Sequence, residues 1–279
     1  MKIARVFPRK TKATPDDSLA FANCSPPTSL PEIDEVHISV TFTYDMRRAE
    51  ELEREWRVIG VPVKMGGAAF NQPSGEFVPG MYLKQGYTIT SRGCPNRCWF
   101  CNVWKREGNL RELEIKSGWN ICDDNLLACS DQHINAVFDM LKTQKERAVF
   151  SGGFEAKRLK PWHLERLREL NPARIYFAYD TPDDYEPLVE AGKLLRQYRF
   201  NIRQCCCYVL IGYPQDTFEK AEKRLVDAMK AGFWTFAMLY KDEQGFEDLQ
   251  WRRFQREWCN ATIVGVKLKE LENKRNLIV

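Results

Sequence analysis

The stretch Tyr87–Cys101 reads YTITSRGCPNRCWFC, and it decides how the rest of the chain is interpreted. Its opening, YTIT at 87–90, is rich in β-branched and aromatic side chains, which is typical of a strand. Cys94, Cys98 and Cys101 follow, with three residues in the first gap and two in the second. The stretch therefore predicts a strand that ends in a short loop carrying three thiols.

Downstream of this loop, short apolar runs alternate with segments whose apolar residues recur at helical spacing, within 134–141, 164–170, 188–198 and 221–229. The last helix is expected to begin at Asp216 or Thr217 and to end at Gly232. Such alternation favours a parallel sheet with right-handed crossovers. We therefore expect an α/β fold with a partial (β/α)6 TIM-type barrel. Its predicted strands are YTIT (87–90), WNIC (119–122), RAVFS (147–151), RIYFAYD (174–180), RQCCCYVLIGY (203–213) and WTFAMLY (234–240).

Upstream of the loop, residues 36–67 show a strand–helix–strand pattern that ends in the pair Gly66-Gly67. Residues 1–35 hold several prolines and little periodicity, so an irregular segment is expected there. The predicted regions are an irregular lead-in at 1–35, a small N-terminal βαβ segment with a linker at 36–84, the barrel at 85–243, and a C-terminal helical or strand extension at 244–279.

The bulk composition is that of an ordinary globular enzyme, with 44% hydrophobic and 29% charged residues. The net charge of +4 is too small to indicate a nucleic-acid partner by itself. No apolar run reaches the roughly 18 residues of a membrane span, and the N-terminus has no apolar signal core. We therefore expect a cytoplasmic protein that does not interact with membranes.

The ten cysteines favour metal binding over disulfides, because clustered thiols in a reducing compartment usually bind metal. A closed zinc site needs four ligands, and the next candidates, Cys122 and His133, lie well beyond the loop. Three thiolates can instead hold three irons of a cubane iron–sulfur cluster and leave the fourth iron open.

The spacing C-x3-C-x2-C, with Phe100 directly before the third cysteine, resembles the signature of the radical S-adenosylmethionine (radical SAM) superfamily over residues 85–240. The resemblance implies that Cys94, Cys98 and Cys101 bind a [4Fe–4S] cluster, whose open iron takes S-adenosyl-L-methionine. One electron, from an external donor such as flavodoxin or ferredoxin, then yields methionine and a 5′-deoxyadenosyl radical. That radical abstracts a hydrogen atom from a substrate that the sequence does not identify. Phe100 is expected beside the cluster or the adenine, or else as a core aromatic residue.

The resemblance also implies a GGE-like segment that holds the methionine amino group at a strand's carboxyl end, where β/α barrels place functional residues. The position after the second predicted strand favours Asp123-Asp124-Asn125. Similarity to the residues of GGE instead favours Gly152, Gly153 and Glu155 in SGGFEAK. Both segments remain candidates. For either one, the alternative is a plain turn after a strand, where Asp, Asn and Gly are common. Lys157 and Arg158 either pair with the methionine carboxylate or form a surface pair.

Two further residues complete the S-adenosylmethionine site that the resemblance implies. Asp180 is expected to bind ribose hydroxyls, unless it or a neighbour caps the next helix. Gly212 is expected to let the backbone approach the adenine.

Three other features have competing interpretations. The run Cys205–Cys207 is expected to be buried in its strand rather than to hold a second cluster. The segment 36–67 resembles part of a flavodoxin-like, cobalamin-binding module, but no D-x-H-x-x-G stretch exists, so no cobalamin is expected. QWRRFQREW at 250–258 predicts a helix docked through Trp251, Phe254 and Trp258, or alternatively a nucleic-acid contact through its arginines.

The leading hypothesis is thus a radical SAM enzyme with an unknown substrate, for which nucleic acid is one candidate. The alternatives are a non-catalytic zinc or iron–sulfur interaction module and an electron-transfer protein. An electron-transfer protein would need a fourth thiolate to close its cluster.

Overall fold

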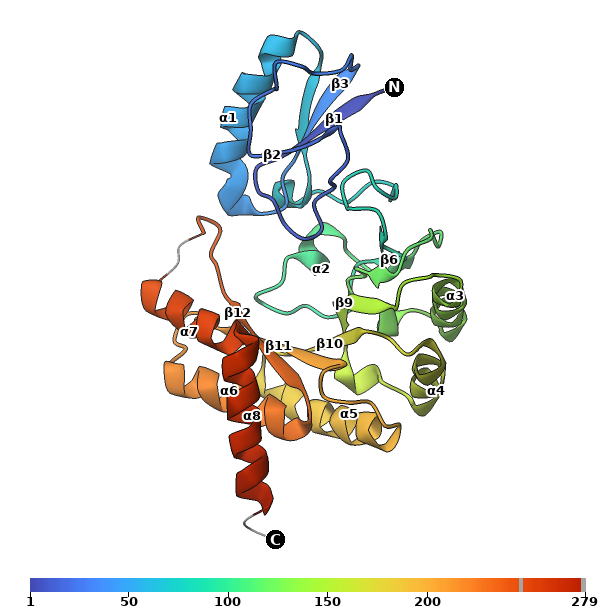
Figure 1. Cartoon of the computed structure of the whole chain (residues 1–279), viewed down its shortest axis with the longest axis vertical. Coiled ribbons are helices and arrows are strands. Elements are labelled where there is room, and N and C mark those ends of the chain that lie inside the picture. The colour runs from blue at the N-terminus through green and yellow to red at the C-terminus, as the bar shows by residue number, and fades with distance from the viewer. Residues whose placement is uncertain (246–247, 277–279) are drawn as a thin grey trace.

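The computed structural model describes residues 1–245 and 248–276 of the chain, which fold into two α/β units (Figure 1). In the larger unit, six strands pair in parallel in the order β12-β11-β10-β9-β8-β5. The prediction of a six-stranded parallel sheet is confirmed, and the strands pair in the order in which they follow along the chain. These strands are β5 (Tyr87–Thr88), β8 (Asn120–Ile121), β9 (Val149–Phe154), β10 (Arg174–Tyr179), β11 (Cys205–Ile211) and β12 (Trp234–Leu239).

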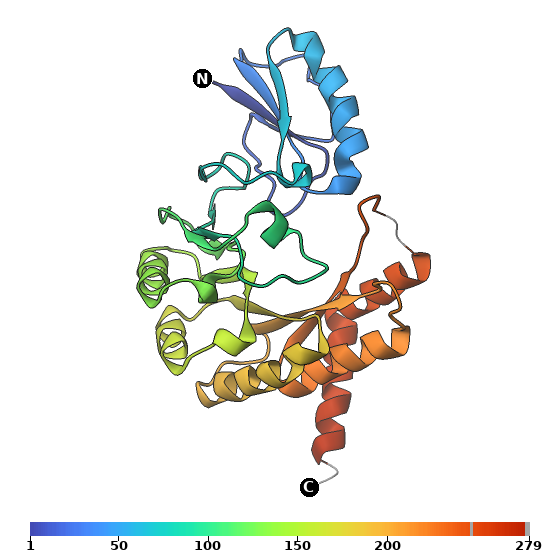
Figure 2. The same cartoon turned by 180° about the vertical axis from the view of Figure 1, so that it is seen from behind.

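The predicted crossover helices are also present, and Figure 2 shows them along one side of this sheet. They are α3 (Asp131–Lys142), α4 (Pro161–Leu170), α5 (Tyr185–Gln197) and α6 (Phe218–Ala231). Helix α6 begins and ends where the sequence predicts, because the Thr217 side chain accepts from the Lys220 amide and Gly232 adopts a left-handed conformation. The apolar stripes of these helices and the sheet enclose one hydrophobic core.

The cysteine run in β11 is buried, as predicted. Cys205 and Cys207 belong to the core that the helices cover, whereas Cys206 lies on the opposite face of the strand. Cys206 is opposite Tyr176 in β10 and Trp234 in β12. These thiols therefore act as small buried side chains within the strand.

The smaller, N-terminal unit contains a parallel sheet of four strands in the order β2-β1-β3-β4. The predicted strand–helix–strand pattern is confirmed, but the prediction of an irregular segment at 1–35 is wrong because β1 and β2 lie there. Each is five residues or fewer and is followed by an irregular connection, so the local pattern is too short to stand out. The elements are β1 (Ile3–Phe7), β2 (Ala20–Ala22), β3 (Glu35–Ser39), α1 (Met46–Trp56) and β4 (Val63–Gly66).

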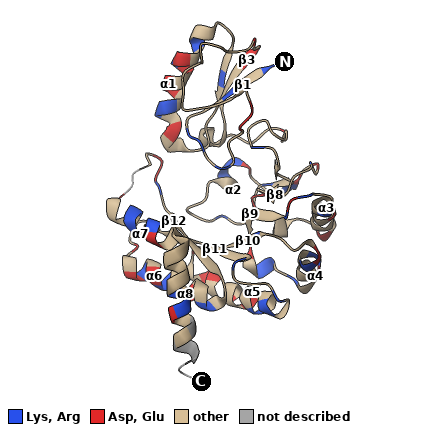
Figure 3. Ribbon diagram, viewed as in Figure 1, with Lys and Arg blue, Asp and Glu red and all other residues tan. Residues whose placement is uncertain are grey.

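This unit has a hydrophobic core of its own. Val6, Ile38 and Leu52 are fully or almost fully buried in it, and Trp56 closes it from α1. The outer side of α1 carries alternating charges (Figure 3), which form ion pairs such as Arg48 with Glu55. Such pairs on an exposed helix face contribute little stability each.

The remaining elements are divided between the two units, with η1, η2 and η3 in the N-terminal unit. The predicted C-terminal helix docks through its aromatic face as expected, and Trp258 is fully buried. The regular elements are β6 (Ser91–Arg92), α2 (Val103–Arg106), β7 (Arg111–Glu112), α7 (Leu249–Cys259) and α8 (Ala261–Asn276). Short 3-10 helices are η1 (Thr43–Asp45), η2 (Arg57–Ile59), η3 (Ala68–Phe70), η4 (Leu126–Ala128), η5 (Ala156–Arg158) and η6 (Pro182–Asp184).

The contacts between the units include one near the carboxyl ends of their strands and one through the linker. The Lys241 ammonium, just after β12, lies 4.8 Å from the ring centroid of Tyr44, just after β3. In the linker, the Ser74 hydroxyl lies 2.6 Å from the Glu107 carboxylate, which follows α2. Figures 1 and 2 both show the segment after β12 rising to the N-terminal unit. No helix in the described part of the chain is long and apolar enough to cross a membrane.

Candidate functional site

The three-cysteine loop follows β5 and β6 at the carboxyl edge of the six-stranded sheet. Gly93 starts the loop with a φ of +84°, and a Cβ there would lie 2.3 Å from the Asn109 carbonyl oxygen. Only glycine suits a position that combines this conformation with so close a backbone contact. The sequence thus turns sharply out of the sheet one residue before Cys94.

The end of β8 anchors this turn. The Asp123 carboxylate accepts hydrogen bonds from the Thr90 amide and hydroxyl and from the Ser91 hydroxyl, at 2.6, 2.6 and 2.7 Å. The neighbouring Asp124 carboxylate accepts from the Gly93 amide at 2.8 Å. Burial raises the pKa of both carboxyls, although these hydrogen bonds act in the opposite direction. Both groups are therefore occupied in fixing the start of the loop.

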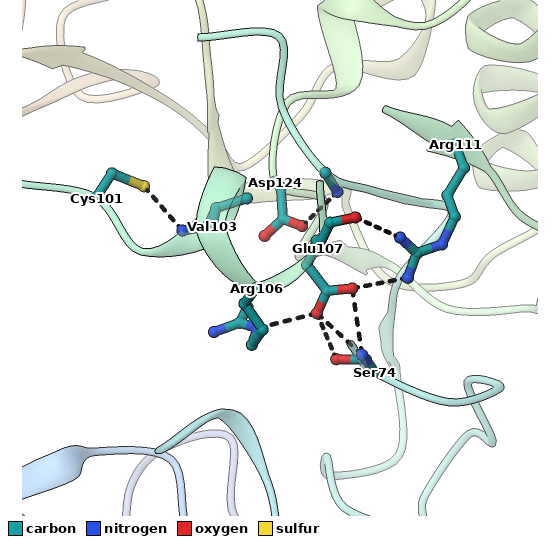
Figure 4. Close-up of polar contacts among 8 residues, drawn as sticks. Ser74, Cys101, Val103, Arg106, Glu107, Arg111 and Asp124 are labelled. Carbon is teal, nitrogen blue, oxygen red and sulfur yellow. Dashed lines mark hydrogen bonds and ion pairs between the residues drawn. The ribbon is translucent and has the colours of Figure 1, made fainter. Parts of the chain in front are cut away.

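The three thiols share one neighbourhood. Burial, followed by the influence of the Cys101 and Cys94 thiols, raises the pKa of Cys98 to about 11. The Cys94 sulfur accepts from the Asn125 side-chain amide at 3.4 Å. Figure 4 shows the Cys101 sulfur, which accepts from the Val103 amide at 3.5 Å. Hydrogen bonds of this kind orient sulfur ligands and stabilise their thiolate form.

In the part of the chain that the structure describes, no three His, Cys, Asp or Glu side chains converge closely enough to hold one metal ion. A single zinc ion needs such convergence of its ligands. An iron–sulfur cluster makes a different demand, because each thiolate binds a different iron.

The tip of the cysteine loop contacts the residues that follow β11 and β12, at the opposite end of the strand order from β5. Trp99 lies 5.6 Å from Tyr213 and 5.9 Å from Tyr240 between ring centroids, and these tyrosines follow β11 and β12. Phe100 packs edge-on against Trp99 at 5.4 Å. The loop that begins after β5 therefore spans the carboxyl edge as far as β11 and β12. Sequence reasoning missed this contact, although an aromatic residue after each of two neighbouring strand ends was a visible signal.

The two candidate GGE-like segments meet in space. The Asn125 side-chain amide donates to the Glu155 carboxylate at 2.7 Å. Gly152 packs so tightly on the end of β8 that a Cβ would lie 2.0 Å from the Asp123 carbonyl oxygen, and Gly153 has a φ of +91°. The carbonyl oxygen of the Asn125 side chain is buried and has no hydrogen-bond partner among the described residues. The unpaired acceptor thus lies beside Cys94.

Lys157 and Arg158 pair with Glu155, at 2.7 and 2.5 Å. Burial alone would raise the pKa of Glu155, but its contacts with Lys157, Asn125, Asn96 and Arg158 outweigh burial and hold the pKa at about 2. Glu155 therefore remains an anion beside the loop.

Asp180 lies near Cys98 but does not cap a helix. Its carboxylate accepts from the Leu210 amide at 3.0 Å, and burial raises its pKa to about 7. Thr181 is the cap of η6, and the Asp184 carboxylate accepts from the Thr181 amide at 2.8 Å. The negative charges of Asp184 and Asp180 add to the rise in the pKa of Cys98, after burial and the other two thiols.

Gly212 lies at the end of β11 with a φ of +70°. Its amide donates to the Asp216 carboxylate at 2.9 Å, and Arg224 binds the same carboxylate at 2.7 Å. A Cβ at Gly212 would lie 2.7 Å from Leu239 and 3.0 Å from Trp251. The absence of a side chain here is thus required by the packing of α7 as well as by the turn.

Glu107 is a buried carboxylate that the sequence did not reveal, and it stabilises the segment that follows the cysteine loop (Figure 4). Glu107 accepts hydrogen bonds from the Arg106 and Arg111 guanidinium groups at 2.9 and 2.7 Å and from Ser74. It therefore ties α2, which follows Cys101, to the linker from the N-terminal unit.

No protein-family model matches this chain, and no curated protein matches it in sequence.

Proposed function

We propose that this protein is a radical SAM enzyme that binds a [4Fe–4S] cluster and reductively cleaves S-adenosylmethionine to a 5′-deoxyadenosyl radical. The observation that carries the proposal is the position of the C-x3-C-x2-C loop. It follows the first strand of a six-stranded parallel sheet whose strands pair in chain order. Carboxyl ends of such strands form the functional edge of β/α folds. We further propose that this sheet is a partial (β/α)6 barrel.

The donor set fits the cluster. Cys94, Cys98 and Cys101 would each bind one iron, and three thiolates leave one iron corner without a protein ligand. The hydrogen bonds to Cys94 and Cys101 come from Asn125 and from the Val103 amide. When bound, the cluster supplies the electron that breaks a carbon–sulfur bond of S-adenosylmethionine.

The neighbouring residues fit the nucleotide. An ammonium group needs oxygen acceptors, and the unpaired side-chain carbonyl of Asn125 lies beside Cys94. The Glu155 carboxylate next to it adds negative charge, although Lys157 and Arg158 already pair with it. The Asp123 and Asp124 carboxylates already accept hydrogen bonds from the start of the loop, so this proposal assigns them an anchoring role. Asp180, Gly212 and Phe100 remain the proposed contacts of the ribose and adenine.

The N-terminal unit would cover this edge. Its strand order, β2-β1-β3-β4, matches the first four strands of the flavodoxin-like order. The likeness concerns the fold alone, and the proposal includes no cobalamin, because no histidine stands in a cobalt-binding motif. The proposed setting is the cytoplasm, with a flavodoxin or ferredoxin as electron donor.

The test is anaerobic reconstitution with iron and sulfide, followed by incubation with S-adenosylmethionine and dithionite. We expect release of 5′-deoxyadenosine, measured by liquid chromatography and mass spectrometry. Cys98→Ala should abolish this release, whereas Cys24→Ala, which removes an exposed thiol of the N-terminal unit, should leave it unchanged. Normal release from Cys98→Ala would refute the ligand assignment.

The same preparation tests the alternative of a non-catalytic metal-binding interaction module. A purified protein with about one zinc per chain and no absorbance band near about 400 nm would favour that alternative.

A further inference from the structure

A band of aromatic and basic side chains crosses the junction of the two units beside the cysteine loop. We call it the junction band, and it consists of Arg97, Trp99, Tyr213, Tyr240, Lys241 and Tyr44. Trp99 joins Tyr213 and Tyr240 by ring contacts, and the next residue, Lys241, lies over the Tyr44 ring. The band thus runs continuously from the loop of the larger unit to the N-terminal unit.

Trp99 is unusual for so large an aromatic residue, since 54% of it is exposed. It contacts Tyr213 at an interplanar angle of 72° and Phe100 at 89°, so neither of these two neighbours stacks flat on its ring. Tryptophan and tyrosine are enriched at binding interfaces, and Trp99 forms one aromatic group with Tyr213 and Tyr240. A planar group could stack on the exposed part of this ring.

Basic groups accompany the aromatic residues. Arg97 is exposed on the loop, and the Arg9 guanidinium lies 5.4 Å from the Tyr44 ring centroid. Arg9 and its neighbour Lys10 also line a cavity of about 640 Å³ at the carboxyl edge of the N-terminal sheet. Figure 3 shows basic segments on both sides of the junction.

The nearest carboxylates are already engaged. Two carboxylates line the same cavity: Asp45, which pairs with Arg9 at 2.8 Å, and Glu51, which pairs with Arg48 at 3.2 Å. Asp216 is paired with Arg224, and Asp184 accepts hydrogen bonds from the backbone of η6. These contacts offset the negative charge that would otherwise repel an anionic ligand.

We propose that the junction band binds a single-stranded nucleic acid, with bases stacked on Trp99 and phosphates held by Lys241 and Arg97. Alternating aromatic and basic side chains are the common chemistry of such surfaces. A single strand fits better than a duplex, because only a base that is unpaired and unstacked from its neighbouring bases can stack on an exposed ring. The proposal goes beyond the proposed function and would place the strand beside the cysteine loop.

The basic face of α7 lacks this combination. On α7, Arg253 and Arg256 are exposed, but Phe254 and Trp258 face the core. Their rings are therefore not available for stacking, and the junction band replaces this helix as the nucleic-acid candidate.

The test measures fluorescence anisotropy of a short fluorescein-labelled RNA of mixed sequence with the full-length protein at several salt concentrations. DNA of the same sequence and the RNA duplex are the comparison probes. We expect salt-dependent binding of single strands, weakened about tenfold or more by Trp99→Ala and largely retained by Trp99→Phe. Lys241→Glu and Arg97→Glu should lower affinity and reduce the salt dependence by about one phosphate contact each.

Matched controls carry the same charge change elsewhere. Arg47→Glu, on a side chain of α1 that is 93% exposed, and the double variant Arg253→Glu/Arg256→Glu should bind like the wild type. The proposal is overturned if the wild type does not bind single strands, if it prefers the duplex, if Trp99→Ala binds normally, or if the α7 variant alone loses binding. Because no S-adenosylmethionine is used, strand binding and nucleotide cleavage are measured independently, so the two results can fail separately.

Discussion

At the scale of single residues, Glu107 is the most consequential group outside the cysteine loop. Its side chain is fully buried, yet it remains ionised because it accepts hydrogen bonds from Ser74 and from two arginines. A buried carboxylate is stable only when it is paired in this way. Glu107 therefore couples the position of α2, and with it Cys101, to the linker from the N-terminal unit.

Glu107→Gln should lower the free energy of unfolding by about 3 kcal/mol, because it leaves Arg106 and Arg111 without their shared counter-charge. The matched control is Glu114→Gln, since the Glu114 side chain is 74% exposed and pairs with Lys116. That change should cost less than about 0.5 kcal/mol. Chemical denaturation measures the free energy of unfolding of both variants. Equal losses of stability in the two variants would contradict the role given to Glu107.

The same residue predicts a pH dependence. Burial raises the pKa of Glu107, but the hydrogen bonds from Ser74, Arg106 and Arg111 outweigh burial and lower the pKa from 4.5 to about 2. The folded state therefore binds this proton less readily than the unfolded state does, so the stabilisation is complete above pH 4.5. The stability difference between the wild type and Glu107→Gln should shrink as the pH falls from 4.5 towards 2. Denaturation at several pH values checks this, and a constant difference would exclude the ion pairs as its source.

At the scale of elements, the close approach of α5 and α6 shapes the helical side of the larger unit. Gly192 lies inside α5, where a Cβ would be 1.9 Å from the Ala231 carbonyl oxygen at the end of α6 and 3.2 Å from the Phe233 ring. Both helices cover the strands that end at Asp180 and Gly212. Their spacing therefore fixes where those strand ends meet the cysteine loop.

Gly192→Ala should cost about 1–3 kcal/mol of stability, because the added methyl group must push α5 away from the backbone of α6. Gly265→Ala in α8 is the control, since its Cβ would meet only the Trp234 ring, at 3.8 Å. That variant should gain about 0.5–1 kcal/mol from helix propensity. Thermal unfolding of the two variants distinguishes them, and a stabilising effect of Gly192→Ala would show that the helices are spaced more widely.

At the scale of the whole molecule, the chain has two separate hydrophobic cores. One holds Val6, Leu52 and Trp56, and the other holds Leu195 and Trp258. The units meet through polar and aromatic contacts, notably Ser74 with Glu107 and Lys241 with Tyr44. Contacts of this kind permit relative domain motion more readily than a large apolar interface does.

Because the two units have separate hydrophobic cores, we expect each unit to unfold locally without the other. Leu52→Ala should destabilise the N-terminal unit by about 2–5 kcal/mol and speed amide hydrogen exchange in β1, β3 and α1. Leu195→Ala should do the same for the larger unit, and Leu52 and Leu195 are equally suitable because both are almost fully buried. Hydrogen-exchange mass spectrometry reads each unit separately, and a uniform increase across the chain from either variant would indicate one cooperative unit.

Local sequence patterns were enough to predict the parts of the fold that depend on neighbouring residues. Apolar alternation and helical stripes predicted all six strands of the larger sheet, and the buried Trp258 followed from its place on a helical stripe. The cysteine spacing could be read directly, because the residues that share that loop are neighbours in the chain. The strands β1 and β2 escaped prediction because three to five residues between irregular segments carry too little periodicity.

Tertiary structure decided the parts that depend on which strand ends meet. It placed the Asp123 carboxylate against Thr90 at the start of the loop, and the Asn125 amide against the Glu155 carboxylate. It also brought the Trp99 ring into contact with Tyr213 and Tyr240. Each of these pairs is separated by about thirty residues or more, and local periodicity carries no information about contacts at that range. A side chain's type fixes what it can bind, whereas the order of strands in the sheet fixes what it actually meets.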